Sequence, residues 1–258
     1  MPARPVIAIV RPPTPAIALC ELTHIERQPI DVERALAQHR AYTALLRSLG
    51  ADVITLPPEP DLPDAVFVED VAVVLDEIAI LTNPGAPSRR PEVAGVAGAL
   101  EPHRLLFTIR DPATLDGGDV IVAGRTIRVG LSGRSNPAAI EQLREIVEPH
   151  GYRVRSAAVH GCLHLKSACT WLGDGAWLVN PDWVDPASFG PGPVLPVHPS
   201  EPRAANTFRV GDALVMAGGF PATRELLERH GFTVHTTELS ELQKAEAGGS
   251  CMSLIFRA

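Results

Sequence analysis

The sequence predicts an α/β protein made of repeated units arranged around a common axis. The 258-residue chain contains 25 Pro and 21 Gly, which argues against long helices because both residues weaken or interrupt the helical hydrogen-bond ladder. Hydrophobic residues make up 45% of the chain, which argues against collagen-like or disordered structure. A set of strands plus one helix recurs about every 40–55 residues, a period typical of propellers and arrays.

The predicted helices end at glycine, and a short β-branched strand follows directly. This pattern occurs at Gly50, Gly151 and Gly231. A glycine just past the end of a helix adopts the left-handed backbone conformation that satisfies the last carbonyls at little steric cost. The three glycines therefore mark equivalent positions in three of the units.

An apolar strand and a Pro/Gly-rich loop are expected before the helices. These strands lie at 78–81, 127–129, 176–179 and 213–216. Two of them are expected to form hairpins with the segments just upstream, 71–75 and 120–122. An ordinary α/β sheet is the simpler alternative, but recurrence at four or five places favours a radial arrangement whose loops converge on the axis. Because no shift in composition marks a boundary, residues 1–258 are expected to form a single domain.

Charge and cysteine content exclude several classes of partner. The formal net charge is −7, and no basic cluster exceeds a pair such as Arg89-Arg90, so nucleic-acid binding is not expected. The apolar run at 6–10 is too short for a signal peptide or a membrane span. The four cysteines are Cys20, Cys162, Cys169 and Cys251. In a chain of this length they are expected to be free thiols in a reducing compartment, which predicts a cytoplasmic protein without a membrane partner.

Cys251 is a candidate nucleophile. It follows Gly248-Gly249 and precedes a predicted strand at 252–256, so a flexible turn would present its thiol at the start of a strand. Most free cysteines are small buried hydrophobic residues, and that alternative stays open on the sequence pattern alone.

His164 is a candidate general base for such a thiol. The alternation over 162–167 predicts a strand with Cys162, His164 and Lys166 on one face. A purely structural histidine is one alternative. A zinc site that includes His160 and Cys162 is another, although the paired CxxC spacing of four-ligand sites is absent.

Acidic residues are concentrated at 64–70 and 115–120, beside apolar strand residues and glycine turns. They could bind a cationic ligand or orient a histidine, or they could be solvated loop residues. Arg89 and Arg134 each follow the loop after a predicted strand, at equivalent places in successive units. Arginine there could bind a carboxylate through two hydrogen bonds, with ordinary surface charge as the alternative.

Six segments together resemble the dimethylarginine dimethylaminohydrolase family of guanidine-modifying enzymes, in the pentein superfamily. They are LPDAVFVEDVAVV at 62–74, PGAPSRR at 84–90, ATLDGGDV at 113–120, VGLSGRSN at 129–136, LHLKS at 163–167 and GSCMSL at 249–254. They occur in family order and span most of the chain. The resemblance implies a five-fold pseudo-symmetric α/β propeller, the pentein fold, built of ββαβ-type repeats.

The resemblance also implies a role for each matching residue. Cys251 would be the nucleophile, His164 the general acid/base, and Asp116 the carboxylate that orients the histidine. The implied substrate-binding residues are Leu22 in the segment matching a mobile lid, Asp64, Glu69, Asp70, Arg89, Arg134 and Ala245. Among them Asp70 would pair with the guanidinium, Asp64 would lie near the α-amino end, and the two arginines would hold the α-carboxylate. No metal and no organic cofactor is implied.

The implied reaction is hydrolysis of Nω-methylated arginines to citrulline plus dimethylamine or methylamine, through a covalent thiouronium on the cysteine. The partner would be this small-molecule substrate, and the protein a monomer or homodimer. A deiminase-like enzyme acting on free arginine or another guanidino compound is an alternative, although such enzymes tend to carry an inserted helical region. A non-catalytic binder of cationic amino acids and an unrelated Cys/His hydrolase are further alternatives. Cys20, Cys162 and Cys169 are predicted to be packing residues.

Overall fold

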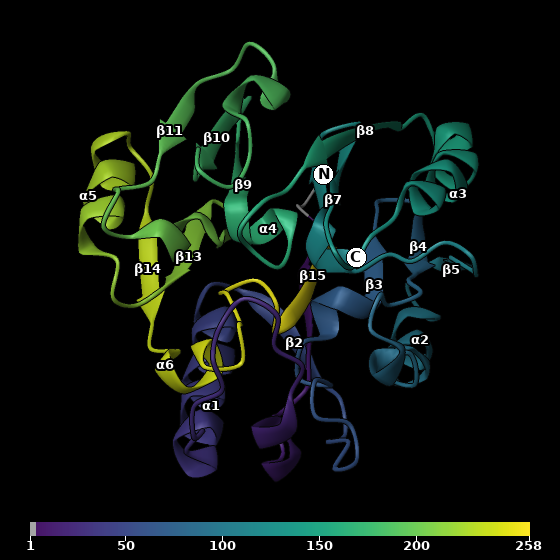
Figure 1. Cartoon of the computed structure of the whole chain (residues 1–258), viewed down its shortest axis with the longest axis horizontal. Coiled ribbons are helices and arrows are strands. Elements are labelled where there is room, and N and C mark those ends of the chain that lie inside the picture. The colour runs from purple at the N-terminus through teal and green to yellow at the C-terminus, as the bar shows by residue number, and fades with distance from the viewer. Residues whose placement is uncertain (1–3) are drawn as a thin grey trace.

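Five three-stranded sheets form a ring in the computed structural model, which describes residues 4–258 (Figure 1). Four sheets use consecutive strands: β3 (Ala72–Val74), β4 (Ile78–Leu81) and β5 (Leu105–Thr108); β6 (Val120–Ala123), β7 (Thr126–Leu131) and β8 (Arg153–Ala158); β9 (Cys169–Gly173), β10 (Ala176–Val179) and β11 (Val194–Pro196); β12 (Thr207–Val210), β13 (Ala213–Ala217) and β14 (Val234–Thr237). In each, the first two strands pair antiparallel and the last two pair parallel. The radial α/β arrangement and the two hairpins predicted from the sequence are confirmed.

The fifth sheet joins the two ends of the chain. The last strand, β15 (Ser253–Arg257), pairs antiparallel with the first, β1 (Val6–Val10), and β1 pairs parallel with β2 (Ala51–Thr55). This sheet has the same strand pattern as the other four, except that its innermost strand comes from the end of the sequence. The pairing therefore closes the ring.

Helices connect the parallel strands on the outside of the ring. They are α1 (Val32–Ser48), α2 (Glu92–Leu100), α3 (Pro137–Val147) and α5 (Pro221–Arg229), and Figure 1 shows them around the periphery. The short helices are α4 (Leu165–Ala168) and α6 (Ser240–Gln243), with 3₁₀ turns η1 (Pro15–Leu19), η2 (Val68–Val71), η3 (Pro87–Arg89), η4 (Gly117–Asp119), η5 (Glu148–His150), η6 (Pro186–Phe189) and η7 (Pro202–Ala205). None of the helices described within residues 4–258 is long and apolar enough to span a membrane.

Local sequence accounts for where these helices begin and end. Helix α3 starts after Asn136, whose side chain accepts the backbone N–H of Ala139, as expected of an N-cap residue. The three glycines predicted to follow helices have φ values of 87° (Gly50), 80° (Gly151) and 85° (Gly231). These left-handed conformations confirm the predicted stops, because other residues adopt them only with strain.

The unit of β9, β10 and β11 is the fourth along the chain when the unit of β1 and β2 is counted first. It differs from the sequence prediction, since the strand at 176–179 is not followed by an α-helix. Its connection contains only the 3₁₀ turn η6 before β11. The connecting segment contains four prolines and two glycines between residues 181 and 193, and these residues disfavour a continuous helix. The repeat is therefore ββαβ in four units and lacks its α-helix in one.

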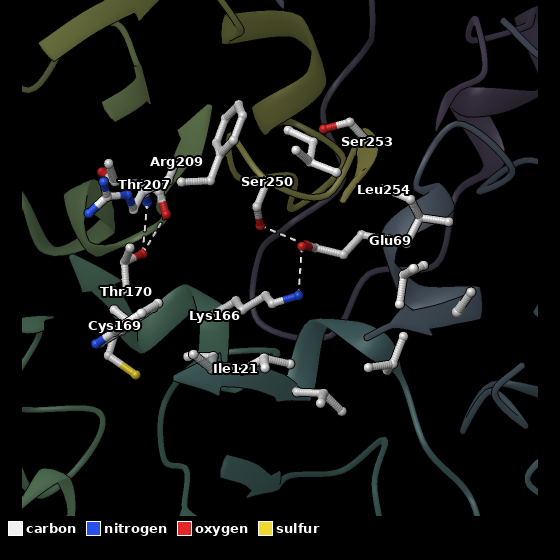
Figure 2. Close-up of a pocket in the computed structure, with 18 residues that line it drawn as sticks. Glu69, Ile121, Lys166, Cys169, Thr170, Thr207, Arg209, Ser250, Ser253 and Leu254 are labelled. Carbon is white, nitrogen blue, oxygen red and sulfur yellow. Dashed lines mark hydrogen bonds and ion pairs between the residues drawn. The ribbon is translucent and has the colours of Figure 1, made fainter. Parts of the chain in front are cut away.

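The innermost strands β3, β6, β9, β12 and β15 surround an axial channel of about 280 Å³ (Figure 2). Lys166, Glu69 and Ser250 lie along this channel, where Lys166 Nζ donates to Glu69 Oε1 at 2.7 Å and Ser250 Oγ donates to Glu69 Oε2 at 2.6 Å. This chain of hydrogen bonds joins segments that precede three different innermost strands.

Replacing Leu254 of β15 with alanine is expected to lower the free energy of unfolding by about 2–5 kcal/mol, because a buried side chain would leave a cavity at the ring closure. Urea unfolding followed by circular dichroism measures the change. Leu105→Ala is the control, since Leu105 lies on β5 but is 66% exposed, whereas Leu254 is 5% exposed. We expect a change within about 0.5 kcal/mol there; similar losses at both positions would contradict the role of the closing strand.

Candidate active site

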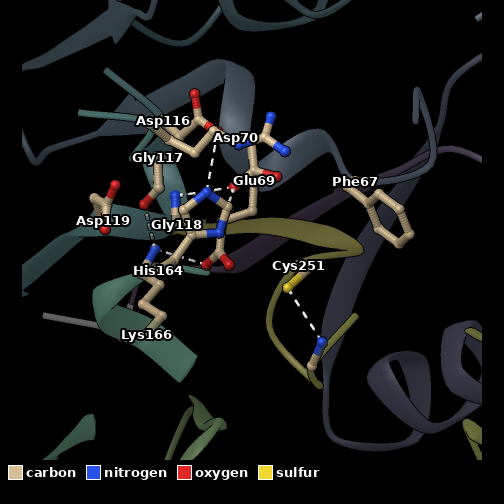
Figure 3. Close-up of polar contacts among 12 residues, drawn as sticks. Phe67, Glu69, Asp70, Asp116, Gly117, Gly118, Asp119, His164, Lys166 and Cys251 are labelled. Atoms are coloured by element: carbon tan, nitrogen blue, oxygen red, sulfur yellow. Dashed lines mark hydrogen bonds and ion pairs between the residues drawn. The ribbon is translucent and has the colours of Figure 1, made fainter. Parts of the chain in front are cut away.

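His164 lies between two buried carboxylates near the axis of the ring (Figure 3). Its Nε2 is 3.0 Å from Asp116 Oδ2, and its Nδ1 is 3.8 Å from Asp70 Oδ1. Because an ionised carboxylate only accepts hydrogen bonds, Nε2 carries a proton and donates it to Asp116. The second ring nitrogen, Nδ1, is therefore the one free to exchange a proton.

The predicted strand over 162–167 is wrong. His164 has extended backbone and caps the short helix α4, which begins at Leu165. The Leu165 N–H donates to the Asp119 carboxylate at 2.9 Å, so a side chain takes the place of a strand partner. Cys162, His164 and Lys166 consequently border three different cavities rather than sharing one face.

Asp116 is fixed by hydrogen bonds to both carboxylate oxygens. Oδ2 accepts from His164, and Oδ1 accepts the Gly85 N–H at 2.8 Å. The two glycines that follow are required by close packing. A Cβ on Gly117 would lie 2.0 Å from the carbonyl oxygen of Glu69, and one on Gly118 would lie 2.6 Å from His164 Nδ1. The GlyGly pair therefore allows the histidine and its acidic partners to approach closely.

Cys251 lies in the turn that leads into β15, close to the position predicted from the sequence. Its backbone carbonyl accepts the Glu69 N–H at 3.1 Å, and its Sγ accepts the Gly248 N–H at 3.3 Å. Burial, together with the negative charges of Glu69 and Asp70, raises the pKa of the thiol to about 12. Without a bound cation the residue is therefore a thiol at neutral pH.

The pKa shift of Cys251 favours its neutral form, whereas that of His164 favours the charged form. Burial alone would lower the pKa of His164, but Asp70, the hydrogen bond to Asp116 and the charge of Asp119 outweigh burial and raise it to about 9. The imidazole is therefore cationic at neutral pH and carries a proton that it can give to a leaving group.

A small cavity of about 20 Å³ is lined by both the cysteine and the histidine. Of the residues predicted from the sequence, it is lined by Asp64, Asp70, Arg89, Arg134, His164, Ala245 and Cys251. These residues come from segments far apart in the chain, so the structure brings together most of the predicted set. Asp116 lies behind His164 and does not line the cavity.

Two predicted substrate residues lie elsewhere. The Glu69 carboxylate faces the axial channel, where Lys166 and Ser250 occupy its oxygens. Leu22 is half-buried against the hydrophobic cluster around Cys20 and does not line the cavity. Five lining residues were not predicted: Glu21, Phe67, Leu163, Glu246 and Ala247. Each of them lies in or next to a predicted residue or motif, so only nearness in the sequence could have predicted that they line the cavity.

The two arginines of the cavity are held differently. Arg89 is buried, its Nε and Nη2 donate to Glu92, and its Nη1 donates to Asp70 Oδ2 at 2.6 Å. Asp70 and Glu92 outweigh burial and raise the pKa of Arg89, whereas burial raises the pKa of Glu92 to about 7. Arg134 is half-buried, and its Nη2 donates to Thr23 Oγ1 at 3.2 Å. Arg134 is thus the more accessible cation.

The segment 21–24 covers the cavity through backbone hydrogen bonds. The N–H groups of Thr23 and His24 donate to the Glu246 carboxylate at 2.5 and 2.9 Å, and the Glu21 N–H donates to Asp64 at 3.1 Å. Glu246 itself has left-handed backbone, with φ of 58°. Three backbone hydrogen bonds therefore hold the segment 21–24 to Asp64 and Glu246, which both line the cavity.

Within residues 4–258, one group has the spacing of a metal site: Asp70, Asp116 and His164, with ligand atoms within 4.8 Å of one another. Each of these side chains already pairs with a protein group, His164 with Asp116 and Asp70 with Arg89. The exposed His160 is not part of the group. The side chains of this group therefore already have hydrogen-bond partners and opposite charges within the protein.

The sequence and the fold are similar to those of known proteins. The family model described as N,N dimethylarginine dimethylhydrolase, eukaryotic, matches residues 21–183. An N(G),N(G)-dimethylarginine dimethylaminohydrolase of Streptomyces coelicolor is 42% identical over 253 residues, which cover 97% of this chain and 96% of that protein. A Cys→Ser variant of the Pseudomonas aeruginosa enzyme, complexed with citrulline, has a TM-score of 0.93 at 32% identity, with 96% of this chain and 98% of that chain covered.

A second solved structure, the adduct of a His→Gly variant of dimethylarginine dimethylaminohydrolase with S-methyl-L-thiocitrulline, has a TM-score of 0.92 at 32% identity and the same coverage. The five-sheet ring with its axial site places this chain among the penteins, the α/β propellers that modify guanidines. Within that class, the family model and the 42% identity show that the chain belongs to the dimethylarginine dimethylaminohydrolase family.

The raised pKa of His164 predicts that its contribution to stability is lost as the pH rises. An unfolded histidine loses its proton near 6.5, whereas His164 keeps its proton up to about 9. The stabilisation is therefore complete below pH 6.5 and disappears through pH 9. The difference in unfolding free energy between wild type and His164→Ala should shrink by up to about 3 kcal/mol across this window. A difference that stays constant with pH would contradict the raised pKa.

Proposed function

We propose that this protein hydrolyses Nω-methylated arginines, asymmetric dimethylarginine and monomethylarginine, to citrulline plus dimethylamine or methylamine. The observation that carries the proposal is the cavity lined by Cys251, the cationic His164 and the carboxylates Asp64 and Asp70. Membership of the family and the likeness to a relative complexed with citrulline support it. The negative cavity suits a guanidinium, and the thiol supplies a nucleophile.

In this proposal the two ends of the substrate are held by opposite charges. Asp70 pairs with the guanidinium, and Asp64 lies near the α-amino group. Arg134 breaks its hydrogen bond to Thr23 and binds the α-carboxylate. Arg89 also donates to this carboxylate, from the second N–H of Nη1, which has no hydrogen-bond partner among the described residues. Arginine suits this task because its planar fork matches a carboxylate.

The chemistry follows from the two shifted pKa values. A bound guanidinium offsets the negative charges that keep Cys251 protonated, so the thiol loses its proton to solvent and the thiolate attacks the guanidinium carbon. His164 donates its Nδ1 proton to the departing amine as the C–N bond breaks, leaving a cationic thiouronium on sulfur. Neutral His164 then takes a proton from water, whose oxygen attacks the same carbon. The C–S bond breaks, and citrulline is released.

A deiminase-like reaction on free arginine uses the same groups and differs only in the leaving amine. A non-catalytic binder of cationic amino acids would need the carboxylates but not the thiol. We further propose that the chain acts as one catalytic domain, as a monomer or homodimer in the cytoplasm, without nucleic acid or membrane partners. Cys20, Cys162 and Cys169 act as packing residues, since all three thiols are buried.

A substrate panel tests the proposal. The protein is offered dimethylarginine, monomethylarginine, arginine and agmatine side by side, and ureido product is measured. We expect citrulline from the two methylated arginines, and no turnover by Cys251→Ser, whose substrate affinity stays within about tenfold of wild type because the carboxylates and arginines remain. Turnover of arginine alone would favour the deiminase. Binding without any product, or full activity of the serine variant, would overturn the mechanism.

Arg134→Ala is expected to raise KM about tenfold or more for substrates with an α-carboxylate, because a charge-assisted hydrogen bond is lost. A methylated agmatine, which lacks that carboxylate, serves as the control substrate. Its kinetic constants should be within about twofold of the wild-type values. Equal losses on both substrates would show that Arg134 supports the cavity rather than binding the carboxylate.

A further inference from the structure

Asp119 is a fully buried carboxylate that does not line the catalytic cavity. Its Oδ1 accepts the backbone N–H of Leu165 at 2.9 Å, and its Oδ2 accepts the hydroxyls of Ser132 at 2.6 Å and Ser135 at 2.7 Å. Each of these three bonds leads to a different segment of the site. A single side chain therefore connects parts of the chain that are far apart in sequence.

The bonds from Leu165 and Ser135 lead to the histidine and its acidic partner. Leu165 directly follows His164, so its N–H ties the backbone of the histidine to Asp119. On the other side, Ser135 Oγ accepts the backbone N–H of Asp116 at 3.1 Å. Asp119 thus holds both members of the His164–Asp116 pair through their backbones, without touching the hydrogen bond between them.

The bond from Ser132 leads to the arginine at the cavity. Ser132 Oγ donates to Asp119 and accepts the backbone N–H of Arg134 at 3.0 Å. The loop that carries Arg134 is therefore anchored on the same carboxylate as the histidine. The chain also leaves room for this carboxylate, since a Cβ on Gly130 would lie 2.6 Å from Asp119 Oδ1.

The three donors favour the ionised form of the carboxylate, because that form accepts freely at both oxygens. Burial raises the pKa of Asp119 to about 6, and the nearby His164 cation and the two serine hydroxyls limit the rise. The group is therefore mainly anionic at neutral pH. In return its charge helps keep His164 protonated.

We propose that Asp119 is a positioning residue that fixes where His164, Asp116 and Arg134 lie relative to one another. It acts through its hydrogen bonds with Leu165, Ser135 and Ser132. Asp119 contacts neither substrate nor the reacting atoms. The bonds from Leu165 and Ser135 affect proton transfer by His164. The bond from Ser132 affects binding of the substrate carboxylate by Arg134. The proposal rests on the proposed function for its kinetic readouts, and on the titration of His164 for a readout that needs no substrate.

Asp119→Asn tests the whole arrangement. The amide keeps one accepting oxygen and places a donor against groups that already donate, so kcat should fall roughly 10²-fold through misplacement of the reacting groups. Loss of the negative charge should also lower the pKa of His164, which shifts the alkaline limb of the pH–rate profile to lower pH. The same shift should appear in the imidazole titration followed by NMR on the free protein.

Two milder variants separate these two effects and keep the test valid if Asp119→Asn does not fold. Ser135→Ala removes the bond to Asp116 and should lower kcat up to about tenfold with KM unchanged. Ser132→Ala removes the bond to the Arg134 loop and should raise KM up to about tenfold for substrates with an α-carboxylate, leaving kcat within about twofold. This split between kcat and KM is the expected signature of positioning.

Glu201→Gln is the matched control. Glu201 is a buried carboxylate that accepts the N–H groups of Ala222 and Thr223 at the start of α5, away from the cavity. This variant should lower the melting temperature without changing kcat, KM or the titration of His164. If the serine variants or Asp119→Asn behave in the same way, Asp119 is only structural and the proposal is overturned. If wild type forms no citrulline, the proposed function fails, while an unshifted His164 titration in Asp119→Asn would refute the positioning role independently.

Discussion

The pairing of β1 with β15 is the contact on which the site depends, because it makes the two ends of the chain part of one sheet and closes the ring. Four site residues lie just before innermost strands: Asp70 before β3, Asp116 before β6, His164 before β9 and Cys251 before β15. Corresponding segments of different units therefore supply the two carboxylates, the histidine and the nucleophile. Because the cysteine belongs to the closing unit, its position relative to the histidine is set by closure of the whole ring.

The site also combines buried charges of both signs with an excess of carboxylates. Its buried acids are Asp64, Asp70, Asp116, Asp119 and Glu92, and its cations are Arg89, Arg134 and His164. Burying charges costs free energy unless each is paired and hydrogen bonded, and most of these groups meet that condition. The remaining negative charge keeps the cysteine protonated until a cation enters. The same feature that weakens the free nucleophile therefore selects a cationic substrate.

Much of the fold was predictable because local rules determine it. Glycine stops such as Gly50 and short hairpins depend on residues close together in sequence, and the structure has both. The missing helix between β10 and β11 follows from the prolines of that segment. The sequence prediction expected a helix there because the other units have one. Membership of the family was predictable from six segments in order.

The site was predictable in composition but less so in geometry. The alternation around His164 predicted a strand, but a distant carboxylate, Asp119, captures the next N–H and starts a helix instead. Adjacent acids were predicted to share a pocket, yet Asp70 faces the histidine while Glu69 faces Lys166 in the channel. Such choices depend on partners far away in the chain, which a single sequence does not display.

The segment 21–24 beside the cavity is held partly through its backbone. Glu246 accepts N–H groups at positions 23 and 24, and every residue except proline can supply such a donor. The side chains of the cover are therefore free to change without loosening this bond, so that wall can be altered to suit a different guanidine. Glu246 lies five residues before Cys251, so the segment that carries the nucleophile is also one of the segments that fix this wall.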